Sequence, residues 1–259
     1  MAPVISVVNH KGGAAKTTTA VNLTAALAEV GQRILVVDLD PQASASLWLG
    51  VRATGEEFLK ATLSGGGFDE LVQHTEAGVD LIPCGPAFAS FEKMVANEAG
   101  SESLLRKALE QMEDRWDYVF LDCPPSLNLT CVNALVASTL AIVPVAAQVL
   151  SLEPLARLID TMGQIRDRFN PDLLLNGIFA SRVDHRTAHG PEILRLLREQ
   201  FGDTIYDASI RENVSVAEAA GFNKSVTQYA PSSSGANDYR VLAREFQKRL
   251  ETQLAEEKA

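Results

Sequence analysis

A short apolar run that leads directly into a glycine-containing loop is the feature that most constrains the fold of this chain. Val4–Val8 predicts a buried strand, and residues 9–20, NHKGGAAKTTTA, follow it without a break. Strand, loop, lysine, hydroxyl residues and helix in this order are typical of a phosphate-binding loop, because backbone N–H groups and a helix N-terminus converge there on an anion. The strict pattern G-x-x-x-x-G-K is missed twice, since His10 and Ala15 stand where the pattern has glycine.

The rest of the chain alternates strand-like and helix-like segments. Further strands are expected at Ile34–Val37, Leu81–Ile82, Tyr118–Leu121, Leu140–Val145, Leu173–Phe179 and Thr204–Tyr206. Helices are expected after the loop (Ala20, Leu23, Leu27 and Val30 on one face, ended by Gly31), at Leu152–Phe169, at Glu192–Gln200, and over about 236–257, where Leu242, Phe246, Leu250 and Leu254 recur at four-residue spacing. Strands that are apolar on both faces predict a mostly parallel, helix-covered sheet, and the absence of a linker predicts a single α/β domain over residues 1–259.

Charge and composition limit the partners of this chain. The 259 residues have a formal net charge of −10, of which residues 1–150 contribute −8 and residues 151–259 contribute −2, so an anionic partner is expected at the second half. No run approaches the roughly 18–20 apolar residues that cross a bilayer, and the first residues lack a signal-like core, so we expect a cytoplasmic protein without a membrane partner. Cys84, Cys123 and Cys131 have no metal-ligand spacing and are expected to be free thiols.

Acidic residues at two strand ends extend the phosphate loop to a hydrolytic site. Gly12 and Gly13 allow close approach of the backbone, Lys16 can reach the β- and γ-phosphates, and Thr17 suits magnesium coordination. Asp38 and Asp40 follow the strand Ile34–Val37, and Asp122 follows Tyr118–Leu121. Because open α/β sheets build their sites at the carboxyl ends of strands, this combination predicts a metal–nucleotide site.

Three motifs carry a resemblance to a known family. Lys11–Thr18 (KGGAAKTT), Val37–Gln42 (VDLDPQ) and Leu121–Ser126 (LDCPPS) resemble the deviant Walker A, A′ and B motifs of the ParA/MinD ATPases, nearest to the chromosomal ParA (Soj) branch. The similarity extends through residues 210–219 and 229–235 and covers nearly the whole chain.

The resemblance implies ATP or ADP with Mg²⁺ as ligands and a P-loop ATPase that forms a homodimer when ATP is bound. Lys11 would reach the partner subunit's nucleotide, and Asp40 would orient the attacking water, so that Lys11, Lys16 and Asp40 are the expected catalytic residues. Thr17, Asp38 and Asp122 are expected to support the metal. The expected nucleotide-binding residues are Lys11, Gly12, Gly13, Ala14, Ala15, Lys16, Thr17, Thr18 and Asn213.

The resemblance also implies non-specific DNA binding by the ATP-bound dimer and stimulation of hydrolysis by a ParB-like or cargo-adaptor partner at the nucleoid. The segment 182–198 has a charge of +2, and Arg182, Arg186, Arg195 and Arg198 are the candidate phosphate contacts. Two positions where relatives carry arginines are Glu212 and Ser215, which predicts weakened binding. The alternative is that the four arginines form only a solvated helical face.

Several alternatives to DNA partition stay open at this point. The chain could position a protein cargo such as chemotaxis clusters. Ala15 departs from the glycine that the family usually carries before the second lysine, so the protein could instead be a nucleotide-dependent regulator with little hydrolysis. An electron-transfer relative of the nitrogenase iron protein would need a cysteine pair able to share an iron–sulfur cluster, and the placement of Cys123 and Cys131 argues against it.

Overall fold

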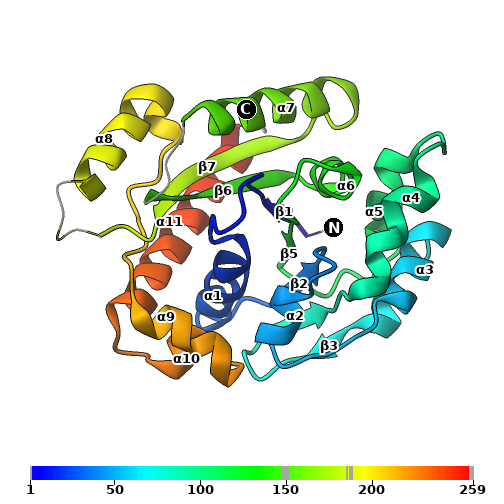
Figure 1. Ribbon diagram of the computed structural model, residues 1–259, viewed down its shortest axis with the longest axis horizontal. Coiled ribbons are helices and arrows are strands. Elements are labelled where there is room, and N and C mark those ends of the chain that lie inside the picture. Colours follow the sequence, from blue (N-terminus) through cyan, green and yellow to red (C-terminus); the bar gives the residue numbers. More distant parts are fainter. Residues whose placement is uncertain (1, 148–151, 185, 187–188, 257–259) are drawn as a thin grey trace.

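The computed structural model describes residues 2–147, 152–184, 186 and 189–256. Within these residues, seven strands form one sheet in the order β3-β4-β2-β5-β1-β6-β7 (Figure 1). The strands are β1 (Val4–Val7), β2 (Ile34–Asp38), β3 (Gln73–His74), β4 (Asp80–Ile82), β5 (Tyr118–Asp122), β6 (Leu140–Ala146) and β7 (Leu174–Ser181). Neighbours are parallel except for β3, which is antiparallel to β4. The predicted α/β domain with a mostly parallel sheet is confirmed.

Helices cover both faces of this sheet (Figure 1). They are α1 (Lys16–Ala28), α2 (Ser44–Trp48), α3 (Glu56–Ser64), α4 (Phe91–Val95), α5 (Leu104–Glu110), α6 (Leu129–Ala137), α7 (Leu152–Arg168), α8 (His189–Phe201), α9 (Val214–Ala219), α10 (Val226–Tyr229) and α11 (Ser234–Glu256). Alternate strand residues enter two cores: Ile5 and Val7 pack in one with α1 and α11, while Val4 packs in the other with α5, α6 and α7. Strands buried on both faces explain why the strand segments are apolar throughout.

The expected strand Thr204–Tyr206 is wrong. Gly202–Thr204 forms a short 3₁₀ helix, and Ile205 makes only an isolated bridge to Ile178. Side chains of α11 take backbone groups that a ladder would have used, because Arg249 donates to the carbonyls of Asp203 and Ile205 at 3.0 and 2.7 Å. The segment Thr204–Tyr206 is therefore a connection that hydrogen-bonds to the last helix.

Two helix ends differ from their expected positions. Val30 is 59% exposed, because α1 ends at Ala28 and Gly31 turns the chain with a φ of 90°. The last helix begins at Ser234, slightly earlier than expected. Leu242, Phe246 and Leu250 are buried in the core that includes α1, which confirms that this helix packs on the body, whereas the side chain of Leu254 lies outside the described residues.

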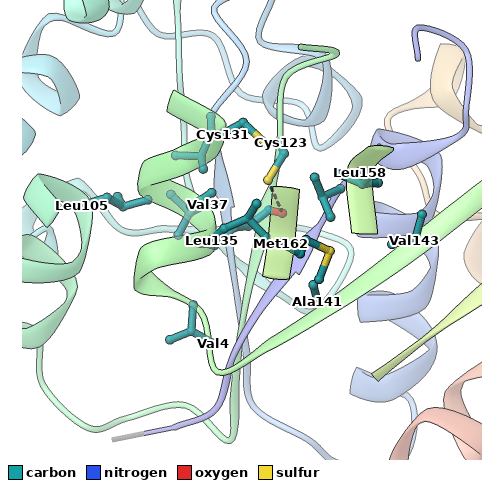
Figure 2. Close-up of a cluster of buried hydrophobic side chains, with 14 of the residues drawn as sticks. Val4, Val37, Leu105, Cys123, Cys131, Leu135, Ala141, Val143, Leu158 and Met162 are labelled. Atoms are coloured by element: carbon teal, nitrogen blue, oxygen red, sulfur yellow. Dashed lines mark hydrogen bonds between the residues drawn. The ribbon is translucent and has the colours of Figure 1, made fainter. Parts of the chain in front are cut away.

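The cysteines lie in the protein interior. Figure 2 shows Cys123 and Cys131 among the apolar side chains between the sheet and α6, and both are 1% exposed. The Cys123 thiol donates to the carbonyl of Leu121, and its hydrogen bond with Cys131, together with burial, raises the pKa of Cys123 well above its usual range. All three cysteines are free thiols. Thiols in this setting are not presented to a cluster at a subunit surface.

Among the described residues, no helix is both long and apolar enough to span a bilayer.

Candidate nucleotide site

A cavity of about 560 Å³ opens where the loop after β1 faces the segments that follow β2, β5 and β7. This volume suits a small-molecule ligand such as a nucleotide. The lining residues are Gly12, Gly13, Ala14, Ala15, Lys16, Thr17, Thr18, Asp40, Ser44, Trp48, Pro125, Ser181, Arg182, Ile210, Arg211, Glu212, Asn213, Val216, Ala217, Ala220 and Tyr239. Every predicted nucleotide-binding residue except Lys11 lines this cavity.

The loop between β1 and α1 is held in an uncommon backbone conformation. Gly13 has a φ of 73°, and Ala15 has φ 67° and ψ 28°, which is the left-handed region. Ala15 precedes the first residue of α1, and its carbonyl accepts hydrogen bonds from the backbone N–H and the hydroxyl of Thr19 at 2.9 and 2.7 Å. The position therefore needs the conformation that glycine adopts without strain, and alanine occupies it at a cost of about 1–2 kcal/mol.

Lys16 is buried at the cavity wall. The residue is only 7% exposed, and its Nζ donates a hydrogen bond to the carbonyl of Lys11 at 3.3 Å. Burial lowers the pKa of Lys16, and the nearby Asp122 opposes that shift. A cation held in this way at the start of α1 adds to the positive end of the helix, so this part of the cavity favours a polyanion.

Two aspartates end neighbouring strands and differ in their partners. Asp38 and Asp122 are register partners at the ends of β2 and β5, and both are fully buried. Asp38 accepts hydrogen bonds from the N–H and hydroxyl of Ser46 at 2.9 and 2.7 Å and from the N–H of Asp40 at 3.1 Å. Burial raises the pKa of Asp38 to about 6. Asp38 thus braces the loop that carries Asp40 instead of lining the cavity.

Asp122 is an orphaned carboxyl group. Neither of its oxygens makes a hydrogen bond of normal geometry among the described residues. Burial and the charge of Asp38 raise the pKa of Asp122 well above its usual range, while Thr17 and Lys16 lie close enough to lower it. A buried carboxylate beside a threonine hydroxyl and without a partner fits a hard cation such as Mg²⁺, which prefers oxygen ligands and keeps several waters. The described residues contain no group of three or more metal-ligating side chains, so phosphate and water oxygens would have to complete the shell.

Asp40 and Lys11 lie on different sides of the loop. Asp40 lines the main cavity, and its carboxylate accepts from the N–H of Gln42 at 2.9 Å. Lys11 lines a smaller cavity with Asn9, Val145 and Leu155, and its N–H donates to the Asn9 side chain at 3.0 Å. Lys11 therefore does not line the main cavity, although the two cavities share Gly12, Gly13 and Ala14.

The cavity wall opposite the loop comes from the last third of the chain. Arg211 donates three side-chain hydrogen bonds to Asp238, at 2.6 to 3.2 Å, and Asn213 donates to the hydroxyl of Ser234 at 2.7 Å. These contacts fix the segment between β7 and α9 against the start of α11. The sequence motifs did not indicate five further lining residues: Ser44, Trp48, Ser181, Ala220 and Tyr239. Ser181 is the last residue of β7, and sites in open α/β sheets lie at the carboxyl ends of strands, so its position at a strand end could have indicated it.

Comparison with known proteins identifies the family of this chain. The model of the AAA domain family AAA_31 matches residues 2–175. The chromosome-partitioning ATPase Soj of Thermus thermophilus is 41% identical over 247 residues, which cover 95% of this chain and 96% of that protein. The chain belongs to the ParA/MinD-type ATPase family. The chromosome partitioning protein ParA of Caulobacter vibrioides is 37% identical over 247 residues, which cover 93% of this chain and 92% of that protein.

A solved structure with a similar fold contains a bound nucleotide analogue. The cobyrinic acid a,c-diamide synthase of Mycobacterium smegmatis, solved with an ATP analogue and magnesium, superposes with a TM-score of 0.85 at 29% identity. The match covers 98% of this chain and 97% of that one.

The four arginines that were expected to contact DNA, of which Arg186 matches an arginine of the ParA relatives, are all paired with carboxylates. Arg186 contacts Asp184 at 2.9 Å and Arg198 contacts Asp207 at 3.0 Å. Arg195 contacts Glu192 at 2.6 Å and also pairs with Glu199, and Arg182 contacts Glu212 at 3.4 Å. All four guanidinium groups are at least 48% exposed, and exposed pairs of this kind contribute only about 0–1 kcal/mol. The +2 charge of the segment is thus balanced by acids from outside it.

Proposed function

We propose that this protein is a partition-type ATPase that cycles between an ATP-bound dimer on DNA and a released monomer. The observation that supports this best is the cavity lined by residues 12–18 and Asp40, at the sheet edge where β2 and β5 end in Asp38 and Asp122. It combines an anion-binding helix N-terminus, a buried lysine and acidic groups at one sheet edge. The cargo would be a chromosomal or plasmid centromere complex.

Each residue has a defined task in this proposal. The N–H groups of the loop and Lys16 hold the phosphates, and Thr17 and Asp122 hold magnesium with the phosphate oxygens. The metal, when bound, neutralises charge that develops on the transferred phosphate. Asp40 orients the attacking water from the cavity wall, and Asp38 fixes the Asp40 loop through Ser46.

Lys11 is proposed to act on the partner subunit's nucleotide. Lys11 lines the smaller cavity and not the nucleotide cavity, so a contact with the nucleotide of its own subunit is not favoured. A lysine that binds a phosphate across the interface makes dimer formation depend on ATP. Lys11→Ala should therefore bind ADP as the wild type does but remain monomeric with ATP, as measured by light scattering.

Turnover tests the enzymatic part of the proposal. Phosphate release should be slow with ATP and Mg²⁺ alone and should increase with a ParB-like partner and DNA. Lys16→Ala should abolish both nucleotide binding and the release of phosphate. Wild-type protein that binds ATP but shows no turnover with DNA and partner would refute the ATPase cycle and favour a regulator.

DNA binding is the part on which the arginine pairs bear directly. Each phosphate contact requires a guanidinium group to leave its carboxylate, so we expect binding that is weak and strongly salt-dependent. Duplex DNA of arbitrary sequence should bind with ATP and not with ADP, and Arg186→Ala should lower the salt slope by about one unit. ATP-independent binding, or none at low salt, would refute the DNA step and favour the positioning of a protein cargo.

A further inference from the structure

Asn9 lies where the chain leaves the sheet and enters the phosphate loop. The residue comes two positions after the end of β1 and is 9% exposed. Its Nδ2 donates to the carbonyl of Pro144 in β6 at 2.8 Å, and its Oδ1 accepts from the N–H of Lys11 at 3.0 Å. Because a backbone carbonyl only accepts and a backbone N–H only donates, these two partners fix which way the amide group points.

The bond to Pro144 extends the pairing of β1 with β6 by one step. The N–H of Val8 donates to the carbonyl of Ile142 at 3.1 Å. In a regular parallel pair the next carbonyl of β6 to accept is that of Pro144, and its donor would be the N–H of His10. The side chain of Asn9 donates there instead, while the main chain turns away to form the loop. The start of the loop is thus anchored to β6.

The backbone of Lys11 is held on both sides. Its N–H donates to Asn9, and its carbonyl accepts from the Nζ of Lys16 at 3.3 Å. A bound nucleotide competes for the Lys16 ammonium group, because charged phosphate oxygens form stronger hydrogen bonds with it than a neutral carbonyl does. Asn9 lines the smaller cavity and not the main one, so its bond to Lys11 is not open to that competition.

We infer that Asn9 is a positioning residue, which holds Lys11 in place for the partner subunit's nucleotide when Lys16 turns to the phosphates of its own. The inference rests on the proposed role of Lys11 across the dimer interface. A backbone segment that is already fixed loses less conformational entropy when two subunits associate. By tying Lys11 to β6 before the partner arrives, Asn9 favours the ATP-bound dimer.

Dimer formation with a non-hydrolysable ATP analogue and Mg²⁺ tests this inference, measured by sedimentation over a series of protein concentrations. In Asn9→Ala the backbone of Lys11 must be ordered on association, so the dimer dissociation constant should rise roughly 5- to 30-fold for each of the two lysines. ADP should bind about as it does to the wild type. Asn9→Ser keeps an acceptor for the N–H of Lys11 but is too short to reach Pro144, so it should weaken the dimer as well.

Hydrogen exchange at the N–H of Lys11 separates positioning from stability. In the ligand-free protein this N–H should exchange faster in Asn9→Ala than in the wild type, because its acceptor is gone. Asn170→Ala is the matched control, since Asn170 is 7% exposed and donates to the carbonyls of Leu135 and Ser138 at 2.9 and 2.6 Å, away from both cavities. It should also lower the thermal midpoint but leave the exchange at Lys11 and the dimer constant unchanged.

Failure of the inference can be told from failure of the proposed function. Wild-type protein that stays monomeric with the analogue, or a Lys11→Ala variant that dimerises equally well, overturns the proposed role of Lys11 itself. If those two proteins behave as expected, a wild-type dimer constant or unchanged Lys11 exchange in Asn9→Ala overturns the inference alone. A wild-type dimer constant in Asn9→Ser would overturn the link to β6. An equally weakened dimer in Asn170→Ala would leave lost stability as the cause and overturn positioning.

Discussion

Replacing Ala15 by glycine should stabilise this protein, although the substitution removes a methyl group from the loop. Ala15 has φ 67° and ψ 28°, where an alanine is disfavoured by about 1–2 kcal/mol. Glycine avoids that penalty but loses more backbone entropy on folding, by about 0.5–1 kcal/mol. The difference is a gain of about 0.5–1 kcal/mol in the free energy of unfolding. For a domain of this size the thermal midpoint should rise by about 1–4 °C.

The neighbouring alanine supplies the matched control. Ala14 is buried in the same loop but is not among the residues with positive φ, so Ala14→Gly should lower the midpoint by a similar amount. Ala43, with a φ of 55°, precedes α2 at the Asp40 loop, and Ala43→Gly should again raise it. The assay is thermal and urea unfolding of the ligand-free proteins, with the ADP affinity measured alongside. An Ala15→Gly protein that is destabilised as much as Ala14→Gly would refute the strain argument.

Two further predictions concern buried charges. Because the pKa of Asp38 is raised to about 6 and that of Asp122 is also raised, the folded state retains protons that the unfolded chain releases above about pH 4. Without nucleotide or Mg²⁺, the free energy of unfolding should therefore fall as the pH rises from about 4 to about 6, by about 3 kcal/mol for Asp38. Asp122→Asn should make this fall smaller. Urea unfolding at a series of pH values measures it, and a free energy of unfolding that rises with pH would contradict the prediction. Asp238→Ala should lower the free energy of unfolding by about 3 kcal/mol, because Asp238 is 8% exposed and forms an ion pair with Arg211. Glu192→Ala breaks an exposed ion pair and should lower it by less than about 1 kcal/mol. Equal losses in chemical denaturation would show that burial is not the cause.

The strands of the sheet could be predicted from the sequence because their period is local. Ile34–Val37 and Leu140–Val145 are apolar at every position, which only a strand buried on both faces requires, and the structure confirms both within one residue at their ends. Thr204–Tyr206 combines β-branched and aromatic residues, which are also typical of strands. Arg249 of α11 donates to the carbonyls of Asp203 and Ile205, and Glu245 accepts from the N–H groups of Asp207 and Ala208. These partners lie some 40 residues further along the chain, and no local pattern contains that information.

The phosphate end of the cavity was predictable for a similar reason. Residues 12–18 are contiguous, so the order of glycine, lysine and hydroxyl residues in the sequence is also their order around the cavity. The sequence alone also raised the question of the backbone at Ala15, since an alanine in a glycine position is visible without coordinates. Only the structure gave its φ, and with it the direction in which Ala15→Gly should change the stability.

By itself the sequence determined that this chain builds a parallel sheet with an anion-binding loop at one edge, because both properties arise from short-range spacing. Tertiary structure decided which aspartate is held by hydrogen bonds and which is not: the hydroxyl of Ser46 donates to Asp38, whereas no side chain in the part of the chain that the structure describes makes a hydrogen bond of normal geometry to Asp122. It also decided that Arg182 lies on the cavity wall. That placement depends on the crossover that brings β7 beside β6 and on the packing of residues 210–213 against it, contacts between segments far apart in the chain.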